Sequence, residues 1–547
     1  MTMTKKIAVF GTEPVTGKIG GLGIRQLEVA RVLSKTFNVR LITPYIVETH
    51  REKFPIDRVN YHSPEEIDEV VNWADAVYTN QPAPLVMKMA EKRNKPVAVD
   101  LLALLYFEEM EHLPHDEMGL AEKSTYFSNR IEVMQRQISS GDFFICSNER
   151  ERDYYLGILT MTGKLRPEEY GKGENFNSVI DIAPFGIPRK KPPKGKNILR
   201  GKIEGVGKND FLIIWGGSLW NWYDSLTPVR AMARLVKTSP RAKLVFIPSH
   251  HPALKKPSEM YTKTLNFAKR KGLLNKNVFF HSEWVPYEEH GYYLTEADAG
   301  IATFPNHIEN RFSFRIRLMD YIWGSLPILT NPGNTLSDLV EKRSLGYVVP
   351  CGDDKALAEK IRLLAARPSL SKAIRKNIEA VKNDFYWEKV LKPLAGFFKE
   401  PRKLKPLFHD RLKTLSISDI LGGNLKSVLY LRSSPMEHSV SGIKAIRAVA
   451  PECEIDVVIQ PGVVMEGLGE NVNFLPLPAN IFNPATAAMA INGKKSYDAV
   501  ILSMNQKDFR YYTNVINFAA KMPTRMYWAF NDEFHFIDIK LLCKGAI

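Results

Sequence analysis

The sequence predicts an α/β protein with three parallel sheets, each covered by helices. Short apolar segments alternate with amphipathic ones along most of the chain, which is typical of β-α units. A segment rich in proline and lysine, Gly186–Lys196, interrupts this alternation, and a third series begins near Leu407. The 547 residues are enough for three or four domains of ordinary size.

The first predicted domain comprises residues 1–188 and is expected to be Rossmann-like. Its first strand, Lys6–Gly11, leads through a glycine-rich turn into a helix that starts near Ile24. Further strands are expected at 39–43, 76–79, 96–100, 143–146 and 179–184. Because helices join consecutive strands, the strands should form a parallel sheet with helices on both faces.

The second predicted domain, residues 197–400, repeats this organisation. Strands are expected at 211–215, 244–248, 278–280, 299–303 and 327–330, and helices at 228–237, 357–366 and 370–384. Two such sheets joined by one linker would face each other across a cleft, where open α/β sheets bind ligands. The third predicted domain, residues 407–547, is a smaller Rossmann-like unit with strands at 428–431, 455–459 and 499–502 and a helix at 440–449.

The chain is basic, with a formal net charge of +15. This excess favours anionic partners, such as phosphorylated small molecules or an anionic membrane surface. No basic stretch with interleaved aromatic residues occurs, so no nucleic-acid partner is expected. The four cysteines form no C-x-x-C pair and indicate neither disulfides nor a zinc site. We expect a cytoplasmic protein, and a peripheral position at the inner face of the membrane stays open.

Glycines mark the first turn of each of the first two domains. Gly20, Gly21 and Gly23 precede Arg25 at the start of a helix, where backbone N–H groups can approach an anion. The spacing is not that of the dinucleotide fingerprint, and a plain flexible turn is the alternative. Gly216 and Gly217 end a strand and would let a phosphate approach. Trp220 and Trp222 follow them, and we expect at least one to pack at a domain interface.

The second domain also contains candidate contacts for a nucleotide. Trp284 would stack on a nucleobase, or else would hold the next helix in place as a staple. Arg315 and Arg317 lie two residues apart and would share a face only in an extended segment, where they could grip a diphosphate. Asp320, on the apolar helix that follows, would accept hydrogen bonds from a ribose diol. The alternative for these charges is a buried Arg–Asp ion pair.

Taken together, these motifs resemble the GT-B glycosyltransferases of family 4, also called glycosyl transferases group 1. The resemblance covers about residues 5–397 and rests mainly on Glu296–Ile301, Asp320–Thr330 and Gly346–Asp353. The chain is most similar to a subgroup with the segment F-R-x-R-x-x-D-Y-x-W-x-x-L-P. The resemblance implies two Rossmann-like domains that face a cleft. It also implies a nucleotide-diphosphate sugar on the second sheet and a glycan or lipid-linked acceptor on the first.

The resemblance also implies roles for single residues. Asp320 takes the place of the family's second glutamate, which is expected to hold the ribose. The first glutamate should lie eight residues earlier, where this chain has Phe312, so Glu309 is the nearest candidate for contact with the sugar. On the acceptor side the family's histidine is not evident, and Asp100, Glu108 or Arg150 are expected to line that wall.

The expected activity is transfer of a sugar with retention of the anomeric configuration, in the synthesis of a cell-surface polysaccharide. Arg315, Arg317 and the glycine turns would stabilise the negative charge that develops on the departing diphosphate. No metal or cofactor is expected, and no Asp-x-Asp motif appears. Two alternatives remain: a nucleotide-sugar epimerase on the same scaffold, and a non-catalytic protein, either a pseudo-enzyme that binds nucleotide sugars or a scaffold of a glycan assembly complex. The third domain is weakly similar to half of a heptosyltransferase-like protein and is interpreted as an accessory domain.

Overall fold

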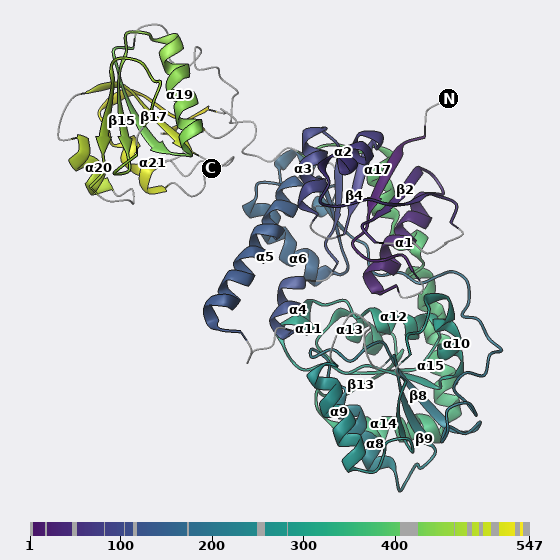
Figure 1. Ribbon diagram of the computed structural model, residues 1–547. Coiled ribbons are helices and arrows are strands. Elements are labelled where there is room, and N and C mark those ends of the chain that lie inside the picture. Colours follow the sequence, from purple (N-terminus) through teal and green to yellow (C-terminus); the bar gives the residue numbers. More distant parts are fainter. Residues whose placement is uncertain are drawn as a thin grey trace. The chain divides into compact units, whose positions relative to one another are not determined.

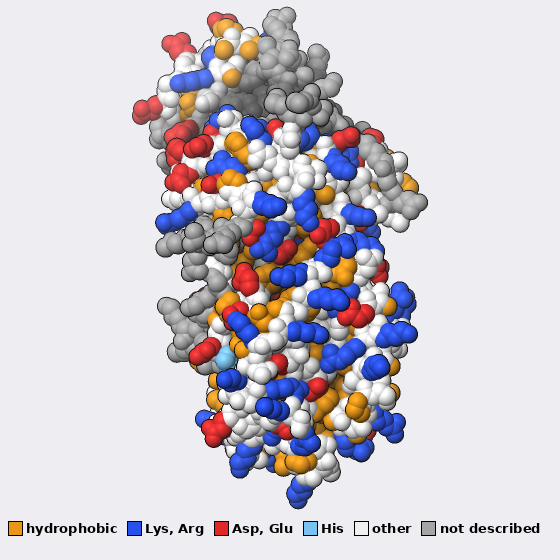
Figure 2. All heavy atoms as spheres, turned by 90° about the vertical axis from the view of Figure 1, so that its right-hand side faces the viewer, with side chains coloured by type: hydrophobic (Ala, Val, Ile, Leu, Met, Phe, Trp, Pro, Cys, Tyr) orange, Lys and Arg blue, Asp and Glu red, His pale blue; other side chains and the backbone are white. Residues whose placement is uncertain are grey.

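The computed structural model divides into two compact units, Met1–Leu404 and Lys405–Ile547, which are described separately (Figure 1). The structure describes residues 4–16, 19–45, 52–80, 83–102, 104–112, 118–171, 174–248, 257–281, 283–404, 425–463, 465–478, 484–491, 496–504, 513–530 and 536–539. Within these residues, no helix is both long and apolar enough to cross a membrane. Lys and Arg side chains are spread over the face of unit 1 seen in Figure 2 and do not form a single patch.

The first domain of unit 1 is built on a seven-stranded sheet in the order β3-β2-β1-β4-β5-β6-β7, with every pair parallel. Its central strands are apolar and buried on both faces, as a helix-covered parallel sheet requires. The strands are β1 Lys6–Phe10, β2 Asn38–Thr43, β3 Ile56–Arg58, β4 Ala76–Thr79, β5 Val97–Asp100, β6 Phe143–Cys146 and β7 Ile180–Ile182. The helices are α1 Gly21–Leu33, α2 Pro64–Trp73, α3 Pro84–Lys92, α4 Leu105–His112, α5 Leu120–Ser140, α6 Glu149–Met161 and α7 Pro167–Tyr170, and a short 3₁₀ turn spans Glu174–Phe176.

The second domain has a six-stranded parallel sheet in the order β10-β9-β8-β11-β12-β13. Helices α8, α9 and α14 lie side by side in Figure 1. The strands are β8 Phe211–Gly216, β9 Ala242–Ile247, β10 Val278–Phe280, β11 Ala299–Ile301, β12 Ile328–Thr330 and β13 Gly346–Val348. The helices are α8 Leu226–Leu235, α9 Glu259–Arg270, α10 His290–Glu296, α11 Ile308–Phe312, α12 Ile316–Trp323, α13 Thr335–Lys342, α14 Asp354–Ala366 and α15 Pro368–Val381, with 3₁₀ turns at Tyr287–Glu289 and Lys382–Asp384.

After the second sheet the chain returns to the first domain through α16, Trp387–Val390, and α17, Lys392–Lys399. The ring of Phe397 stacks on Phe143 of β6 with centroids 5.0 Å apart, and Phe398 meets Phe37 edge-on at 6.3 Å. The end of the second predicted domain therefore packs against the first, and the two domains are connected by two crossings of the chain.

Unit 2 is a single α/β domain with a sheet in the order β16-β15-β14-β17-β18-β19. All pairs are parallel except β18 with β19, which is antiparallel. The strands are β14 Ser427–Ser433, β15 Glu454–Ile459, β16 Val472–Pro476, β17 Tyr497–Met504, β18 Thr524–Phe530 and β19 Phe536–Asp538, and the helices are α19 Met436–Val449, α20 Pro484–Ile491 and α21 Thr513–Ala520. The prediction of three Rossmann-like α/β sheets is confirmed.

The segment around the two arginines joins two helices. Arg311 and Phe312 are the last residues of α11, and α12 begins at Ile316, so only the residues between these helices are extended. Arg315 is the N-cap of α12 with φ −81° and ψ 80°, and its carbonyl accepts the N–H of Leu318. The two arginines therefore lie at the junction of two helices, and both guanidinium groups approach the ring of Tyr223, at 5.8 Å for Arg315 and 3.9 Å for Arg317.

Candidate functional site

A cavity of about 360 Å³ lies between the two domains of unit 1. Its walls come from the segments that follow β1, β5 and β7 in the first domain and β8 and β10 in the second, together with the start of α12. These segments follow the carboxyl ends of parallel strands, which is where open α/β sheets bind ligands. The volume is typical of a small-molecule site.

Eight of the twelve predicted site residues line this cavity, and four do not. Those that line it are Gly20, Gly21, Gly216, Gly217, Trp284, Arg315, Arg317 and Asp320. Those that do not are Gly23, Arg25, Asp100 and Glu309. The predicted residues therefore converge on one place, but several have partners that exclude the expected role.

The start of α1 forms part of the first-domain wall. Gly20 is its N-cap and makes no side-chain cap, so the first N–H groups of the helix have no side-chain partner there. A Cβ on Gly21 would lie 3.2 Å from the side chain of Ile316, so the helix approaches α12 closely. Gly23 faces its own loop, because a Cβ there would lie 2.6 Å from Ile19. Gly23 is thus required by packing and does not line the cavity.

Gly216 and Gly217 leave space at the cavity wall, but their backbone N–H groups are already hydrogen-bonded within the protein. The N–H of Gly216 donates to the hydroxyl of Tyr321 at 3.0 Å, and the N–H of Gly217 donates to the carbonyl of Ile247 at 2.5 Å. The expectation that these N–H groups bind a phosphate is therefore wrong. Gly217 has φ +96°, and a Cβ there would lie 3.4 Å from the guanidinium of Arg317. Glycine is needed here so that Arg317 can lie beside the end of β8.

Arg317 is the charged group best placed to meet a ligand. Only 8% of its surface is exposed, and its guanidinium lies 3.9 Å from the ring centroid of Tyr223. One nitrogen, Nη2, donates to the carbonyl of Ser218 at 3.1 Å. The other, Nη1, is buried and has no hydrogen-bond partner within the described part of the chain. A buried cation with an unmet donor that lines a cavity is a site for an anion.

Arg315 has its donors occupied by the protein. Its Nη1 and Nη2 donate to the two carboxylate oxygens of Glu309 at 2.8 and 2.6 Å, and Nη2 also donates to Asn310 Oδ1 at 2.9 Å. Glu309 is 1% exposed and lies behind the cavity wall. A buried ion pair does occur, but the partner is Glu309 and not an aspartate. The predicted paired grip of two arginines on a diphosphate is therefore not formed.

Asp320 lies one turn after Arg317 on α12 and is partly buried at the cavity. Burial raises the pKa of its carboxyl to about 7, and the nearby positive charge of Arg317 partly opposes this. Its carboxylate makes no hydrogen bond or ion pair with the described residues. A ligand that donates hydrogen bonds would stabilise the ionised form.

Arg25 and Asp100 form a buried ion pair that is part of the core of the first domain. Neither side chain is exposed, and Arg25 Nε lies 2.5 Å from Asp100 Oδ2. The guanidinium also donates to the carbonyls of Ala183 and Pro184 at 2.7 and 2.9 Å, and the hydroxyl of Tyr78 donates to Asp100 at 2.6 Å. The pair joins α1 to β5 and to the segment after β7. Its expected role on the acceptor side is therefore corrected to a structural one.

Sequence reasoning missed or undervalued several groups in the cavity. Glu13, in the loop after β1, lines it, and no sequence pattern marks this residue. Glu108 on α4, one of the three alternatives for the acceptor side, is the one that reaches the cavity. Trp220 and Trp222 also line the cavity, and their rings stack with centroids 5.0 Å apart and an angle of 7°.

Among the described residues, no three His, Cys, Asp or Glu side chains converge as a metal site would need.

Arg150 has a different position from the one expected for it. Its guanidinium donates to the carbonyl of Gly333 at 2.7 Å and lies 2.6 Å from Asp338. Asn148, which caps α6, donates to the carbonyl of Phe312 at 2.9 Å. These contacts hold the start of α6 against the second domain, so Arg150 fastens the two domains together and does not line the cavity.

No protein-family model matches the sequence, and no curated protein matches it. Solved structures do match. Anabaena Alr3699/HepE, in complex with UDP and glucose, is 14% identical with a TM-score of 0.53, and the match covers 72% of this chain and 99% of that one. Sucrose-phosphate synthase from Thermosynechococcus elongatus is 13% identical with a TM-score of 0.50, covering 72% and 98%.

Trehalose-6-phosphate synthase OtsA is 11% identical to this chain with a TM-score of 0.51, and the match covers 73% of this chain and 100% of that one. At these identities the comparison concerns the fold. It agrees with the two parallel sheets of unit 1 and the cavity between their carboxyl edges. The chain therefore has the GT-B fold, with an additional Rossmann-like domain in unit 2.

Proposed function

We propose that the protein is a glycosyltransferase that moves a sugar from a nucleotide-diphosphate donor to a glycan or lipid-linked acceptor. The observation that carries this proposal is the guanidinium of Arg317, which is buried at the cavity with its Nη1 donor unmet. A diphosphate would supply the missing acceptors and the opposite charge. Two solved neighbours with this fold are complexes of HepE with UDP and glucose and with UDP-glucose, which supports a nucleotide sugar as the ligand class.

The donor can be placed from the positions of the lining residues. The diphosphate would lie beside Arg317, on the second-domain side of the cavity. Asp320, one turn further along α12, would accept hydrogen bonds from the ribose. Trp284, which follows β10, would contact the nucleobase. The sugar would then face the first-domain wall, on which the acceptor binds.

In the proposed reaction, the bond between the anomeric carbon and the β-phosphate oxygen breaks, and a bond to an acceptor hydroxyl oxygen forms. The hydroxyl proton passes to the departing diphosphate. Arg317 would stabilise the charge on that leaving group as it develops, since its position is fixed by Tyr223 and Ser218 before substrate binds.

We propose that the anomeric configuration is retained, which NMR of the product would check. Inversion would instead call for a general base on the first-domain wall.

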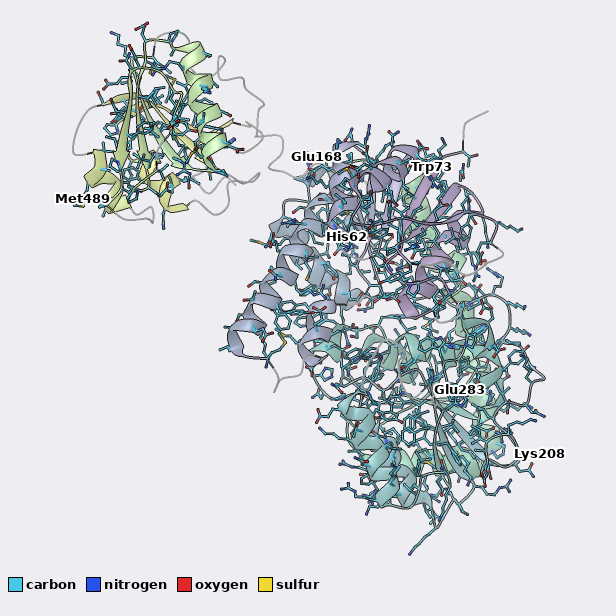
Figure 3. The ribbon with its side chains drawn as sticks, in the orientation of Figure 1. His62, Trp73, Glu168, Lys208, Glu283 and Met489 are labelled. Carbon is cyan, nitrogen blue, oxygen red and sulfur yellow. The ribbon has the colours of Figure 1, made fainter. Side chains whose placement is uncertain are left out.

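Donor binding can be tested directly by calorimetry of the full chain with UDP, GDP, ADP and dTDP and their sugars. We expect one base to bind and Arg317→Ala to lose about 10- to 100-fold in affinity, as for a hydrogen-bonded charge. Lys208→Ala removes an exposed cation of the same domain and is the matched control (Figure 3), because Lys208 precedes β8 and the cavity lies at the other end of that strand. Equal binding by both variants would contradict the proposed grip.

One observation favours a second candidate, a protein that binds nucleotide sugars without transferring them. Arg315 holds Glu309 away from the cavity, so α11 presents no carboxylate to the sugar. Slow hydrolysis of the bound donor without an acceptor separates the candidates, because a transferase activates the anomeric carbon and a binding protein does not. Donor binding with no hydrolysis and no transfer would favour the second candidate.

A further inference from the structure

The first-domain wall of the cavity has an acidic character. Two carboxyl groups line it, Glu13 in the loop after β1 and Glu108 on α4. Both are partly buried, and neither makes a side-chain hydrogen bond or ion pair within the described part of the chain. Carboxylates only accept hydrogen bonds, so the two groups together present acceptors for which the described residues supply no donor. A ligand on this wall should be rich in donors.

The two walls of the cavity differ in their described charged residues. The arginines that line it, Arg315 and Arg317, both belong to the second domain. On the first-domain side, the described lining residues other than Glu13 and Glu108 are glycine, proline or apolar. The described cations therefore lie on the wall where the proposed donor diphosphate binds, together with the Asp320 carboxyl that would meet the ribose, whereas the described charged residues of the first-domain wall are carboxyl groups only.

We infer that the acceptor is a sugar without negative charge at its reacting end, whose hydroxyl groups donate hydrogen bonds to Glu13 and Glu108. This inference rests on the proposed function and specifies its acceptor. A hydroxyl that donates to a carboxylate forms a charge-assisted bond, which is stronger than a neutral one. A phosphate or carboxylate at the same place would face two like charges in a partly desolvated site, and that repulsion is costly.

The names of two solved neighbours, sucrose-phosphate synthase and trehalose-6-phosphate synthase, include a sugar phosphate. The acidic wall predicts that this chain differs from any protein that accepts a phosphorylated sugar on that wall. The shared fold does not decide the matter, because the acceptor is selected by a few side chains in the pocket.

The ionisation of Glu108 predicts that sugar binding depends on pH, which gives a second test of the inference. The pKa of this carboxyl is raised to about 7, chiefly by burial; the negative charges of Glu309 and Glu109 also raise it, and the positive charge of Arg315 opposes them. Burial also raises the pKa of Glu13. Donors from a sugar favour the ionised forms, so affinity for an uncharged sugar should increase as the pH rises through about 7. Affinity for a sugar phosphate should fall over the same range.

Equilibrium binding of sugars to the full chain tests the inference without depending on turnover. The probes are methyl glycosides of hexoses and N-acetylhexosamines and their 6-phosphates, each titrated with and without the nucleoside diphosphate that binds. We expect uncharged glycosides to bind and their phosphates to bind at least tenfold more weakly. Glu108→Gln should lose most of the pH dependence and about tenfold in affinity, as for a charged hydrogen bond.

Two further variants sharpen the experiment. Glu108→Arg should reverse the preference towards the 6-phosphates, and Glu168→Gln, on the outer surface of the first domain, should change nothing (Figure 3). Tighter binding of phosphates than of uncharged glycosides by the unaltered chain would overturn the inference. So would binding of uncharged glycosides that Glu13→Gln and Glu108→Gln leave unchanged. Failure of every nucleoside diphosphate to bind, with sugar preferences as expected, would count only against the proposed function.

Discussion

The guanidinium of Arg315 and the carboxylate of Glu309 form a buried ion pair with two parallel hydrogen bonds of 2.8 and 2.6 Å. The pair joins the end of α11 to the start of α12, and Asn310 adds a third acceptor at 2.9 Å. Arg317, two residues later, has no carboxylate partner of this kind among the described residues and keeps one donor unmet. Two neighbouring arginines thus differ: Arg315 is held by a buried carboxylate, whereas Arg317 keeps a donor unmet, as its proposed binding role requires.

The first prediction separates these roles by stability. Arg315→Ala should lower the free energy of unfolding by about 3–5 kcal/mol, because it leaves the buried Glu309 charge uncompensated. Arg317→Ala should cost much less, since it removes a cation that has no anionic partner of its own in the described structure. Urea denaturation of both variants measures the difference. A larger loss for Arg317→Ala than for Arg315→Ala would contradict the assignment.

The second prediction concerns Asp320. Its pKa in the folded protein is about 7, above the value of about 4 in an unfolded chain, so the folded state binds this proton more tightly. Ionisation therefore destabilises the fold progressively as the pH rises from about 4 to about 7. Asp320→Asn cannot ionise and should raise the Tm of the unliganded protein at pH 8 by several degrees, with a smaller gain at pH 4.5.

The same variant should weaken nucleotide binding, because the amide has lost the charge that a ribose diol would meet. Calorimetry at pH 8 checks this, and the protein's Tm is the control for folding. If Asp320→Asn instead lowered the Tm at pH 8, the carboxylate would have a stabilising partner in the unliganded protein. That result would contradict the claim that this carboxylate is free to bind a ribose.

The third prediction concerns the buried pair of Arg25 and Asp100. Arg25→Met removes the cation and leaves Asp100 buried without its charge partner, so a loss of about 3–5 kcal/mol is expected. The double variant Arg25→Met with Asp100→Asn should recover part of that loss, because no uncompensated charge remains. A double-mutant cycle in urea measures the coupling. If Arg25→Met left the stability unchanged but weakened acceptor binding, the predicted role of Arg25 and Asp100 on the acceptor side would be restored.

Much of the fold could be predicted because buried parallel strands are short apolar runs. The strands Ala76–Thr79, Phe143–Cys146 and Val278–Phe280 have the bounds that the sequence indicates. Strand β3, Ile56–Arg58, was missed because it lies at the edge of its sheet and carries charged residues with no apolar pattern. Helix α12 ends at Trp323, where the apolar helix pattern of the sequence gives way to Gly324 and Ser325, and Ser325 has φ +54°.

The site could be predicted only in part, because residue types were visible and their partners were not. The sequence predicted Arg317 and Asp320 as ligand contacts, but it could not show that Glu309 would take both terminal nitrogens of Arg315. That pairing depends on how α11 turns back towards α12. Likewise Arg25 and Asp100 are 75 residues apart and meet only in the folded sheet. Glu13 is a single acid in a loop and no periodicity marks it.

The fourth prediction concerns the boundary of unit 1. A chain that ends after Leu404 keeps α17, whose Phe397 and Phe398 pack on the first domain, and Lys403, which lies 3.0 Å from Asp142. We expect it to fold with the Tm of unit 1 unchanged. A chain that ends after Asp384 lacks these contacts and should aggregate or unfold. Calorimetric scans of both measure the result, and equal stability would show that α16 and α17 are dispensable.

The central claim is that Arg317 binds the diphosphate of a nucleotide donor. The most direct measurement is a calorimetric titration of the full chain with nucleoside diphosphates, for the unaltered protein, Arg317→Ala and the distant control Lys208→Ala (Figure 3). We expect one nucleoside diphosphate to bind the unaltered protein and the control equally, and to bind Arg317→Ala about 10- to 100-fold more weakly. Binding of the same strength to all three proteins would contradict the claim, as would the absence of binding to any of them.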